Sequence, residues 1–412
     1  MQNITTPKIN ESPGKLFNKD FVLLWLGQMV SATGNSIQYI ALMWWIMNKF
    51  SAAQSGIVMG WMFASNVIPV AILGPFAGVL VDRISRKAIV VFSDALRGML
   101  VLWMAYLAYT NQLTVFWIYT IAALMGAGSA FFRSSLQASI PNIVPDKNLT
   151  RANSLFQTGM QFAQVIGPAL GGVLVGFWGT FFVFALNGVS FLISAFTELF
   201  INFRQSFRKS EKIKSFFGDF KEGLKFTYAK KLIFWTMIIA SLLNFAFAPV
   251  DILIAKQIKV IYKLGALQLG YVASAFAVGM IVGAGLLSII PELKKKHNVV
   301  ILSMFFSGVF FSVMGLAPTL IIFLILALLI GVNISVSDVL FMVVLQRIVP
   351  DEKRGRVFSV LTTFGTVLQP ISLALIGSIS AILTNNVIFL ILGIAVAVGS
   401  LSMYLVPGIK EI

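Results

Sequence analysis

Three carboxylates that fall inside long apolar segments of this chain are the groups best suited to bind and release protons. They are Asp94, Asp251 and Asp338. Apolar surroundings disfavour a charged carboxylate and a nearby cation favours it, so these influences can tune such a group to exchange a proton. Asp94 lies one helical turn from Arg97, which predicts either a local ion pair or a link to the charged turn at Asp82. Asp251 follows Pro249 with no cation near it in its segment. We therefore expect Asp251 to be the first site of proton binding, with Asp94 and Asp338 as further candidates. A solvent-facing interfacial carboxylate is the alternative for Asp251.

Neutral polar residues recur at helical spacing in two of the apolar segments. The first set is Gln28, Ser31, Asn35 and Gln38, and the second is Gln157, Gln161 and Gln164. Steps of three and four residues place each set on one face of a helix. Neutral amides suit a ligand held mainly by apolar contacts with a few hydrogen bonds, and hydrogen bonding between helices is the alternative use. With one aromatic residue and two later amides, the candidate substrate-binding residues are Gln28, Ser31, Asn35, Gln38, Phe131, Gln161, Asn244 and Asn333.

Other chemistries lack the residues that they require. The sequence has no cysteine and one histidine, His297, so we expect no metal site. It has no G-x-x-x-x-G-K-[ST] loop for ATP, which leaves an ion gradient as the source of energy. No cluster of catalytic carboxylates, histidines or nucleophiles is apparent, so we expect neither an enzyme nor a cofactor.

The composition predicts that these residues lie in a membrane. The chain is 58% hydrophobic and 11% charged, outside the usual range of soluble domains. A helix needs roughly 20 apolar residues to cross the hydrocarbon core, and long continuous runs favour helices over the alternating strands of a barrel. Twelve such runs are predicted, at about 21–48, 54–81, 88–109, 114–134, 152–177, 180–203, 232–255, 266–290, 298–317, 319–342, 357–381 and 385–406.

The positions of Lys and Arg predict the orientation. If the N-terminus is cytoplasmic, all 31 basic residues fall on the cytoplasmic side except Lys49, Arg97, Lys256, Lys259 and Lys263. We therefore expect both termini in the cytoplasm of a bacterial plasma membrane. The net charge of +16 follows from this topology and an anionic inner leaflet, so no nucleic acid is expected as a partner. The polar first twenty residues show no removable signal peptide.

A repeated motif predicts two similar halves. The run from Ile143 to Asp146 matches the run from Ile348 to Asp351, about half the chain later, and places Asp338 opposite Arg133. This favours a duplication over chance, with the halves related by an axis along the membrane normal. The expected organisation is a cytoplasmic tail 1–20, a six-helix half 21–203, a cytoplasmic linker 204–231, a second half 232–406 and a tail 407–412. The linker holds an amphipathic stretch that we expect to lie on the inner leaflet, a solvated linker being the alternative.

A short charged turn between the second and third runs carries a family resemblance. Its pattern is Gly78-x-Leu80-x-Asp82-Arg83-x-x-Arg86-Lys87. With twelve runs in two halves and a long central loop, it resembles the major facilitator superfamily, whose signature here is G-x-L-x-D-R-x-G-R-[RK]. Ser85 takes the place of a glycine in that signature. The resemblance implies that charge pairs at this turn lock the two halves together in the outward-open state. The alternative is that these charges only set the orientation of the helices in the membrane. The expected gating residues are Gly78, Asp82, Arg83, Arg86, Lys87 and Arg97.

The fifth run contains a second signature, similar to that of exporters in the superfamily. It is the stretch from Gly167 to Gly172, in which Pro168 bends the helix and the glycines admit a close neighbour. Gating roles are therefore also expected for Gly167, Pro168, Gly171 and Gly172. We expect Gly279 and Gly283 of the eighth run to form the opposing surface, ordinary packing being the alternative.

The motifs before the fifth and eleventh runs most resemble the macrolide-efflux branch of drug:proton antiporters, which also holds siderophore exporters. The resemblance implies an all-α membrane protein with twelve transmembrane helices in two pseudo-symmetric six-helix bundles. Its expected partners are a hydrophobic or amphipathic small-molecule substrate, protons and membrane lipids, and it is expected to be a monomer that works by alternating access. A lysolipid or other lipid flippase of the same fold is one alternative. A transport-inactive scaffold or sensor is another, and would need a larger cytoplasmic region than the linker supplies.

Overall fold

The computed structural model describes residues 16–81, 84–145, 148–203, 216–289, 295–380 and 382–409, and the regular elements in these ranges are helices. Asp82 and Arg83 of the predicted lock lie outside the described residues, as do most of the predicted N-terminal tail, the first part of the linker and Lys410. The elements are α1 Lys19–Lys49, α2 Ala52–Val81, α3 Arg86–Tyr109, α4 Val115–Ile143, α5 Leu149–Leu199, α6 Phe216–Ala229, α7 Lys231–Phe247, α8 Val250–Lys256, the π-helical turn η2 Gln257–Ile261, α9 Ala266–Ile289, α10 Lys296–Met314, α11 Leu320–Ile348, α12 Asp351–Ile379, α13 Asn385–Ser402 and the 3-10 turn η3 Met403–Leu405.

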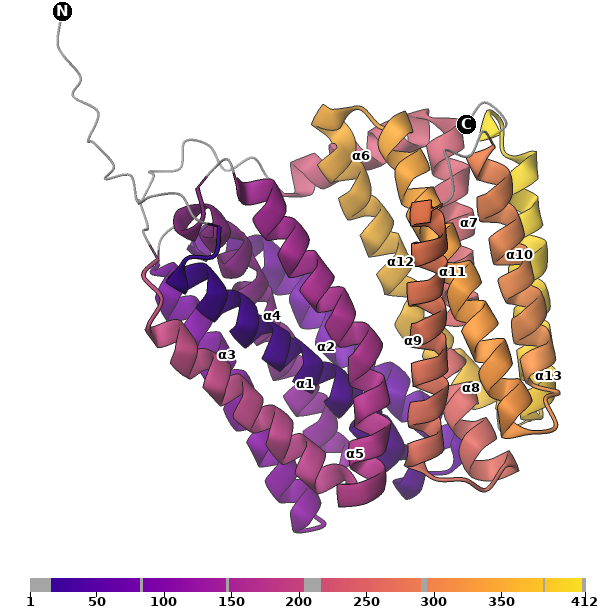
Figure 1. Ribbon diagram of the computed structural model, residues 1–412, viewed down its shortest axis with the longest axis horizontal. Coiled ribbons are helices and arrows are strands. Elements are labelled where there is room, and N and C mark those ends of the chain that lie inside the picture. The colour runs from indigo at the N-terminus through magenta and orange to yellow at the C-terminus, as the bar shows by residue number, and fades with distance from the viewer. Residues whose placement is uncertain are drawn as a thin grey trace, which may run out of the picture.

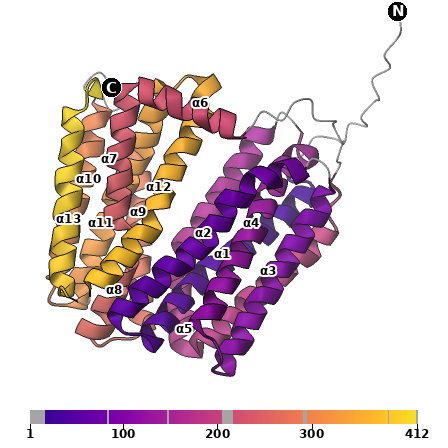
Figure 2. The same ribbon diagram turned by 180° about the vertical axis from the view of Figure 1, so that it is seen from behind.

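The helices form two bundles that meet at one end. The first contains α1 to α5 and the second α7 to α13 (Figure 1). Both views show the bundles diverging toward the end at which α1 begins and α13 finishes, which we call the terminal end (Figures 1 and 2). At the opposite end, which we call the far end, the bundles come together. Ile40 and Met43 of α1 there belong to one buried apolar cluster with Ile252 of α8 and Leu269 of α9, so the core is continuous across the junction.

Helix α5 consists of two arms joined at Gly179. This residue has φ 78° and ψ 174°, a backbone conformation that is open essentially to glycine alone. The chain reverses there, since Leu155 near the start of α5 and Glu198 near its end both bond to the first part of α1. The two arms correspond to the predicted fifth and sixth runs.

A second break interrupts the predicted seventh run. Helix α7 ends at Phe247 and α8 begins at Val250, with Pro249 as the residue that precedes α8. Proline lacks the N–H that would continue the helical hydrogen bonds, so a break at this position is expected. It places Asp251 in the first turn of α8.

Nine helical segments in the described part of the chain are long and apolar enough to cross a membrane. One of them holds both arms of α5, and α1 and α12 have 31 and 29 residues, so the arrangement fits twelve spans. Helix α6 lies inside the predicted linker and packs against α12 and α7. Its expected position on the inner leaflet stays a prediction.

Candidate functional site

The far-end junction is built on two helix crossings that are related by the pseudo-symmetry of the halves. In the crossing of α5 with α9, a methyl group added to Gly172 would lie 2.3 Å from the Cα of Gly270. In the crossing of α2 with α12, one added to Gly60 would lie 2.9 Å from the backbone nitrogen of Ala374. Both distances are too short for a side chain, so glycine is what lets the two bundles touch.

The predicted role of Gly279 and Gly283 as the surface facing the fifth run is wrong. A methyl group on either would clash with the α11 backbone, at Leu328 and Val332 respectively, so these glycines pack within the second bundle. Gly270, which lies nine residues before Gly279 in α9, opposes α5 instead. Glycine spacing identified a close-packed face but could not identify its partner.

A cavity of about 780 Å³ lies between the bundles. It is formed by α1 and the first arm of α5 on one side and by α7, α8, α9 and α11 on the other, and most of its lining side chains are apolar. Its polar or ionisable lining residues are Tyr39, Thr158, Gln161, Gln164, Asp251, Ser335 and Asp338. An apolar wall with a few placed polar groups, at this volume, suits a drug-sized amphipathic molecule.

The far end of the cavity is closed by polar contacts between the bundles. The Tyr39 hydroxyl of α1 donates a hydrogen bond to Asp251 Oδ2 of α8 at 3.0 Å. The Lys259 Nζ of η2 donates to the carbonyl oxygen of Met47 and lies 5.9 Å from the Trp44 ring centre. We call these contacts the far gate. Asp251 is thus both a cavity residue and a gate residue, since its carboxylate touches the opposite bundle.

Three of the four predicted polar residues on α1 bond to the second arm of α5 and are not part of the cavity lining. Gln28 Nε2 donates to Glu198 Oε1 at 3.3 Å, and Asn187 Nδ2 donates to the side-chain oxygens of Asn35 and Gln38. The fourth, Ser31, is buried and donates to the Gln28 carbonyl oxygen. We call this row of contacts the polar seam. In the structure these polar residues therefore form hydrogen bonds between helices, which is the alternative that their spacing also allowed.

The other predicted binding residues are divided between the cavity and its surroundings. Gln161 lines the cavity, together with Gln164 of the same set. The amides of Asn244 and Asn333 donate to carbonyl oxygens one turn back in their own helices, at 3.0 and 2.8 Å. These two residues and Phe131 are not among the residues that line the cavity.

A buried ionic cluster lies inside the first bundle. The predicted pair of Asp94 and Arg97 is present, with 2.6 Å between Asp94 Oδ1 and Arg97 Nη2. The Arg97 guanidinium also lies 4.1 Å from the ring centre of Phe132. Glu198 joins this cluster and was missed by the sequence analysis, although it lies inside the predicted run 180–203. Its spacing from Asn187, Ser190 and Ser194 is helical and is the signal that could have revealed it.

The residues of the charged turn that the structure describes bond within the first bundle. Arg86 Nη1 donates to the carbonyl oxygen of Ala138 at 2.7 Å, and Lys87 Nζ donates to that of Leu199 at 2.6 Å. Ser85 caps α3 by accepting from the backbone N–H of Ala88, which is a use for a serine in place of glycine. Gly78 lies in the last turns of α2. A lock between halves stays a prediction, because the bundles diverge at this end.

The exporter-like stretch of α5 faces two neighbours. Gly167 and Gly171 pack against α1, where added methyl groups would lie 2.3 Å from Ser36 Cβ and 2.9 Å from the Ile37 carbonyl oxygen. Gly172 packs against α9, and Pro168 lines the cavity. This segment therefore contacts both bundles and the cavity, and its conformational role stays a prediction.

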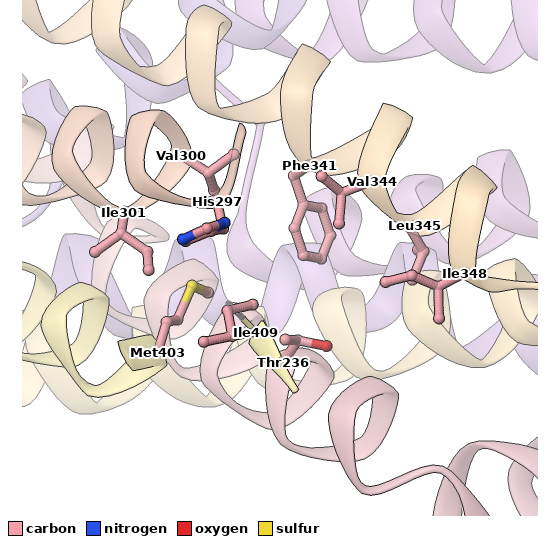
Figure 3. Close-up of a pocket in the computed structure, with 10 residues that line it drawn as sticks. All are labelled: Thr236, His297, Val300, Ile301, Phe341, Val344, Leu345, Ile348, Met403 and Ile409. Atoms are coloured by element: carbon pink, nitrogen blue, oxygen red, sulfur yellow. The ribbon is translucent and has the colours of Figure 1, made fainter. Parts of the chain in front are cut away.

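A second, much smaller pocket lies in the second bundle. It has a volume of about 20 Å³ and is bounded by side chains including Thr236, His297, Phe341 and Met403 (Figure 3). That volume has room for about one water molecule. It therefore cannot hold an organic substrate, and the larger cavity is the candidate pathway.

Comparison with known proteins identifies the family. A family model described as a transmembrane secretion effector, within the major facilitator superfamily, matches residues 12–408. The chain belongs to this family. It is 23% identical to macrolide efflux protein A of Streptococcus pyogenes over 86% of the chain and 88% of the relative. It is 20% identical to the multidrug efflux pump Tap of Mycolicibacterium fortuitum over 95% of the chain and 96% of the relative.

Solved structures share the major facilitator fold. A bacterial homologue of the iron transporter ferroportin, in an inward-facing state, has a TM-score of 0.73 at 18% identity and covers 95% of this chain and 98% of its own. A bacterial homologue of the human lysosomal transporter Spinster has a TM-score of 0.71 at 15% identity and covers 96% and 97%. The predicted fold class and family are confirmed: the chain is a multi-pass membrane transporter and not an enzyme.

Proposed function

We propose that this transporter exports hydrophobic or amphipathic small molecules, in the class of macrolides and other drugs or siderophores, by alternating access coupled to proton entry. The observation that carries the proposal is the interbundle cavity, whose apolar wall includes Asp251 and Asp338. A drug-sized molecule gains from the apolar contact area, and a cavity carboxylate can exchange its proton. The names of the efflux relatives support the substrate class.

The orientation follows from the basic residues. The segments rich in Lys and Arg connect helices at the terminal end, so we place that end and both termini in the cytoplasm of a bacterial plasma membrane. The structure is then inward-open, with the far gate closed against the exterior. Tyr39 and Asp251 would separate when the protein opens outward, which would expose Asp251 to external protons.

The test is transport into inverted membrane vesicles. Labelled erythromycin, a macrolide, and a cationic dye are offered with and without a pH gradient to the wild type, to Asp251→Asn and to Asp20→Asn. Asp20 is a matched control, because its carboxylate accepts from the backbone of Asn202 at the terminal end, away from the cavity. We expect gradient-driven uptake in the wild type and Asp20→Asn, and its loss in Asp251→Asn. If uptake of every compound is independent of the pH gradient, the result contradicts antiport. If uptake by Asp251→Asn still depends on the gradient, proton binding is instead assigned to Asp94 or Asp338.

Lipid movement is a second candidate function, because the cavity reaches apolar residues on the outside of the helices. Phe162 of α5 and Ile281 of α9 both line the cavity and are 52% and 56% exposed. A lysolipid could rest its acyl chain along such a surface. Uptake of labelled lysolipid that exceeds uptake of every drug in the same vesicles would favour this function.

A further inference from the structure

The first bundle encloses an ionic cluster that the cavity does not contain. Asp94 and Glu198 are completely buried and Arg97 is 6% exposed. Asp94 and Arg97 come from α3, and Glu198 comes from the end of the second arm of α5. Each of the two carboxyl groups lies within electrostatic range of the other and of the guanidinium.

The hydrogen bonds of this cluster are incomplete. Glu198 Oε1 accepts from Gln28 Nε2 at 3.3 Å and from Ser194 Oγ at 3.4 Å. Glu198 Oε2 and Asp94 Oδ2 are also buried, and within the described part of the chain no donor meets either oxygen with good hydrogen-bond geometry, although the two carboxyl groups lie close to each other. A buried carboxylate oxygen without a donor is unfavourable, and a bound proton is the smallest ligand that would relieve it.

The charges of the cluster do not balance when both carboxyl groups are ionised. Arg97 supplies one positive charge, and the groups over it on α4 and α5 are the aromatic rings of Phe132 and Phe191. Two charged groups at the same end of α5 bond to backbone, Lys87 to Leu199 and Asp20 to Asn202. Gln28 and Ser194 are neutral. One proton held by the two carboxyl groups makes the cluster neutral, which a low-dielectric interior favours.

We propose that Asp94 and Glu198 form a proton-binding site inside the first bundle, separate from Asp251, that takes up and releases one proton in the transport cycle. This proposal rests on the proposed antiport function. The proton binds to a carboxylate oxygen and leaves both carboxylates ionised on its departure, with Arg97 retaining its charge throughout. Glu198 and Asp94 are the proton-binding groups, and Gln28 is a positioning residue that acts through Glu198.

Helix α1 carries contacts of both this site and the far gate. From Gln28 the polar seam continues along α1 to Asn35 and Gln38, both bonded to Asn187, and the next residue is Tyr39 of the gate. Gly34 allows this closeness, since an added methyl group would lie 2.1 Å from Asn187 Oδ1. A change of charge at Glu198 therefore acts on the helix that holds Tyr39 against Asp251.

Infrared difference spectroscopy on purified full-length protein tests the site without depending on transport. The background is Asp251→Asn, and the carbonyl stretch of protonated carboxyl groups is followed as pH is changed. We expect a titrating band from a buried carboxyl group in this background, and its loss when Glu198→Gln is added. A band unchanged by both Glu198→Gln and Asp94→Asn overturns the proposal. If Glu198→Gln does not fold, Glu198→Asp must shift the titration of the band, and an unshifted titration overturns the proposal equally.

A transport measurement links the site to coupling. In proteoliposomes, Glu198→Gln is expected to lose erythromycin movement driven by a pH gradient while it retains exchange of labelled for unlabelled erythromycin. The matched control is Glu222→Gln, which alters an exposed carboxylate on α6 and should retain both activities. Gradient-driven movement at the wild-type rate in Glu198→Gln overturns the coupling role. If the wild type moves no compound, the proposed function fails, while the infrared band still decides whether the proton site exists.

Discussion

At the scale of single residues, the contact that matters most is the one between Tyr39 and Asp251. It is a direct hydrogen bond from one bundle to the other at the closed end of the cavity. In the proposed antiport, a substrate or proton that reached Asp251 would compete with this bond. This gives a physical link between ligand binding and the positions of the bundles.

Removal of that hydroxyl should shift the conformational balance. Tyr39→Phe deletes a hydrogen bond to a carboxylate, worth about 1–2 kcal/mol, so we expect the population with an open far gate to rise roughly 5- to 30-fold. The distance between spin labels on Gln112→Cys and Thr384→Cys, at the far ends of the two bundles, reports this by pulsed electron resonance. The chain contains no cysteine, so no other site is labelled.

Tyr119→Phe is the matched control for this substitution, since Tyr119 packs on the core of the first bundle. It should leave the distance distribution unchanged. A distribution in Tyr39→Phe that equals that of the wild type would show that the bond does not hold the gate.

Sequence reasoning found some of these residues and missed others for definable reasons. Asp251 could be predicted from the sequence, because a carboxylate close to a proline in an apolar run is unusual. Gln28 and Asn35 were correctly placed on one face, but helical periodicity does not say whether that face meets a cavity or another helix. Glu198 was not predicted, because its contacts with Asp94 and Gln28 join helices that are far apart in the sequence. Its burial depends on the return of α5 at Gly179.

At the scale of elements, the crossing of α5 with α9 depends on paired glycines. Gly172 and Gly270 are in backbone contact, and α5 also packs on α1 through Gly167 and Gly171. The first arm of α5 therefore contacts α1 on one side and the second bundle on another. Motion between bundles involves this surface, where glycines let the two backbones lie close together.

A methyl group at this crossing should prevent full closure of the far gate. In Gly172→Ala the new Cβ would lie 2.3 Å from Gly270 Cα, and such overpacking costs about 1–3 kcal/mol. We expect a longer distance between the far-end labels and slower efflux of erythromycin.

Gly285→Ala on α9 provides the comparison, because a methyl group there meets nothing within 4 Å. It should match the wild type in both measurements. If the far-end distance in Gly172→Ala equals that of the wild type, α5 and α9 can accommodate the methyl group without opening the far gate, and the prediction is wrong.

The boundaries of the helices could be predicted from the sequence better than the neighbours against which each helix packs. The predicted runs agree with most of the helices, since apolar length and charged breaks are local properties. The break between α7 and α8 lies inside a predicted continuous run, although Pro249 marks it. The partner of each glycine face was not accessible, because it depends on how whole helices are arranged.

At the scale of the whole molecule, two similar bundles share one closed junction and one cavity. The far gate, the glycine crossings and the continuous apolar core lie at the far end, whereas the bundles diverge at the terminal end. An exporter must also adopt the reverse arrangement, in which the terminal end closes. Residues of the charged turn would then be free to meet the second bundle, as the family resemblance implies.

The central claim is that the two ends open in alternation, and paired distance measurements test it most directly. One spin-label pair is at the far end, on Gln112→Cys and Thr384→Cys, and the other is at the terminal end, on Asn153→Cys in α5 and Ser288→Cys in α9. Both are measured in lipid nanodiscs at neutral and acidic pH, with and without erythromycin. We expect reciprocal changes, in which the terminal-end distance shortens as the far-end distance lengthens. Two distances that stay constant, or that lengthen together, in protein that transports would contradict alternating access.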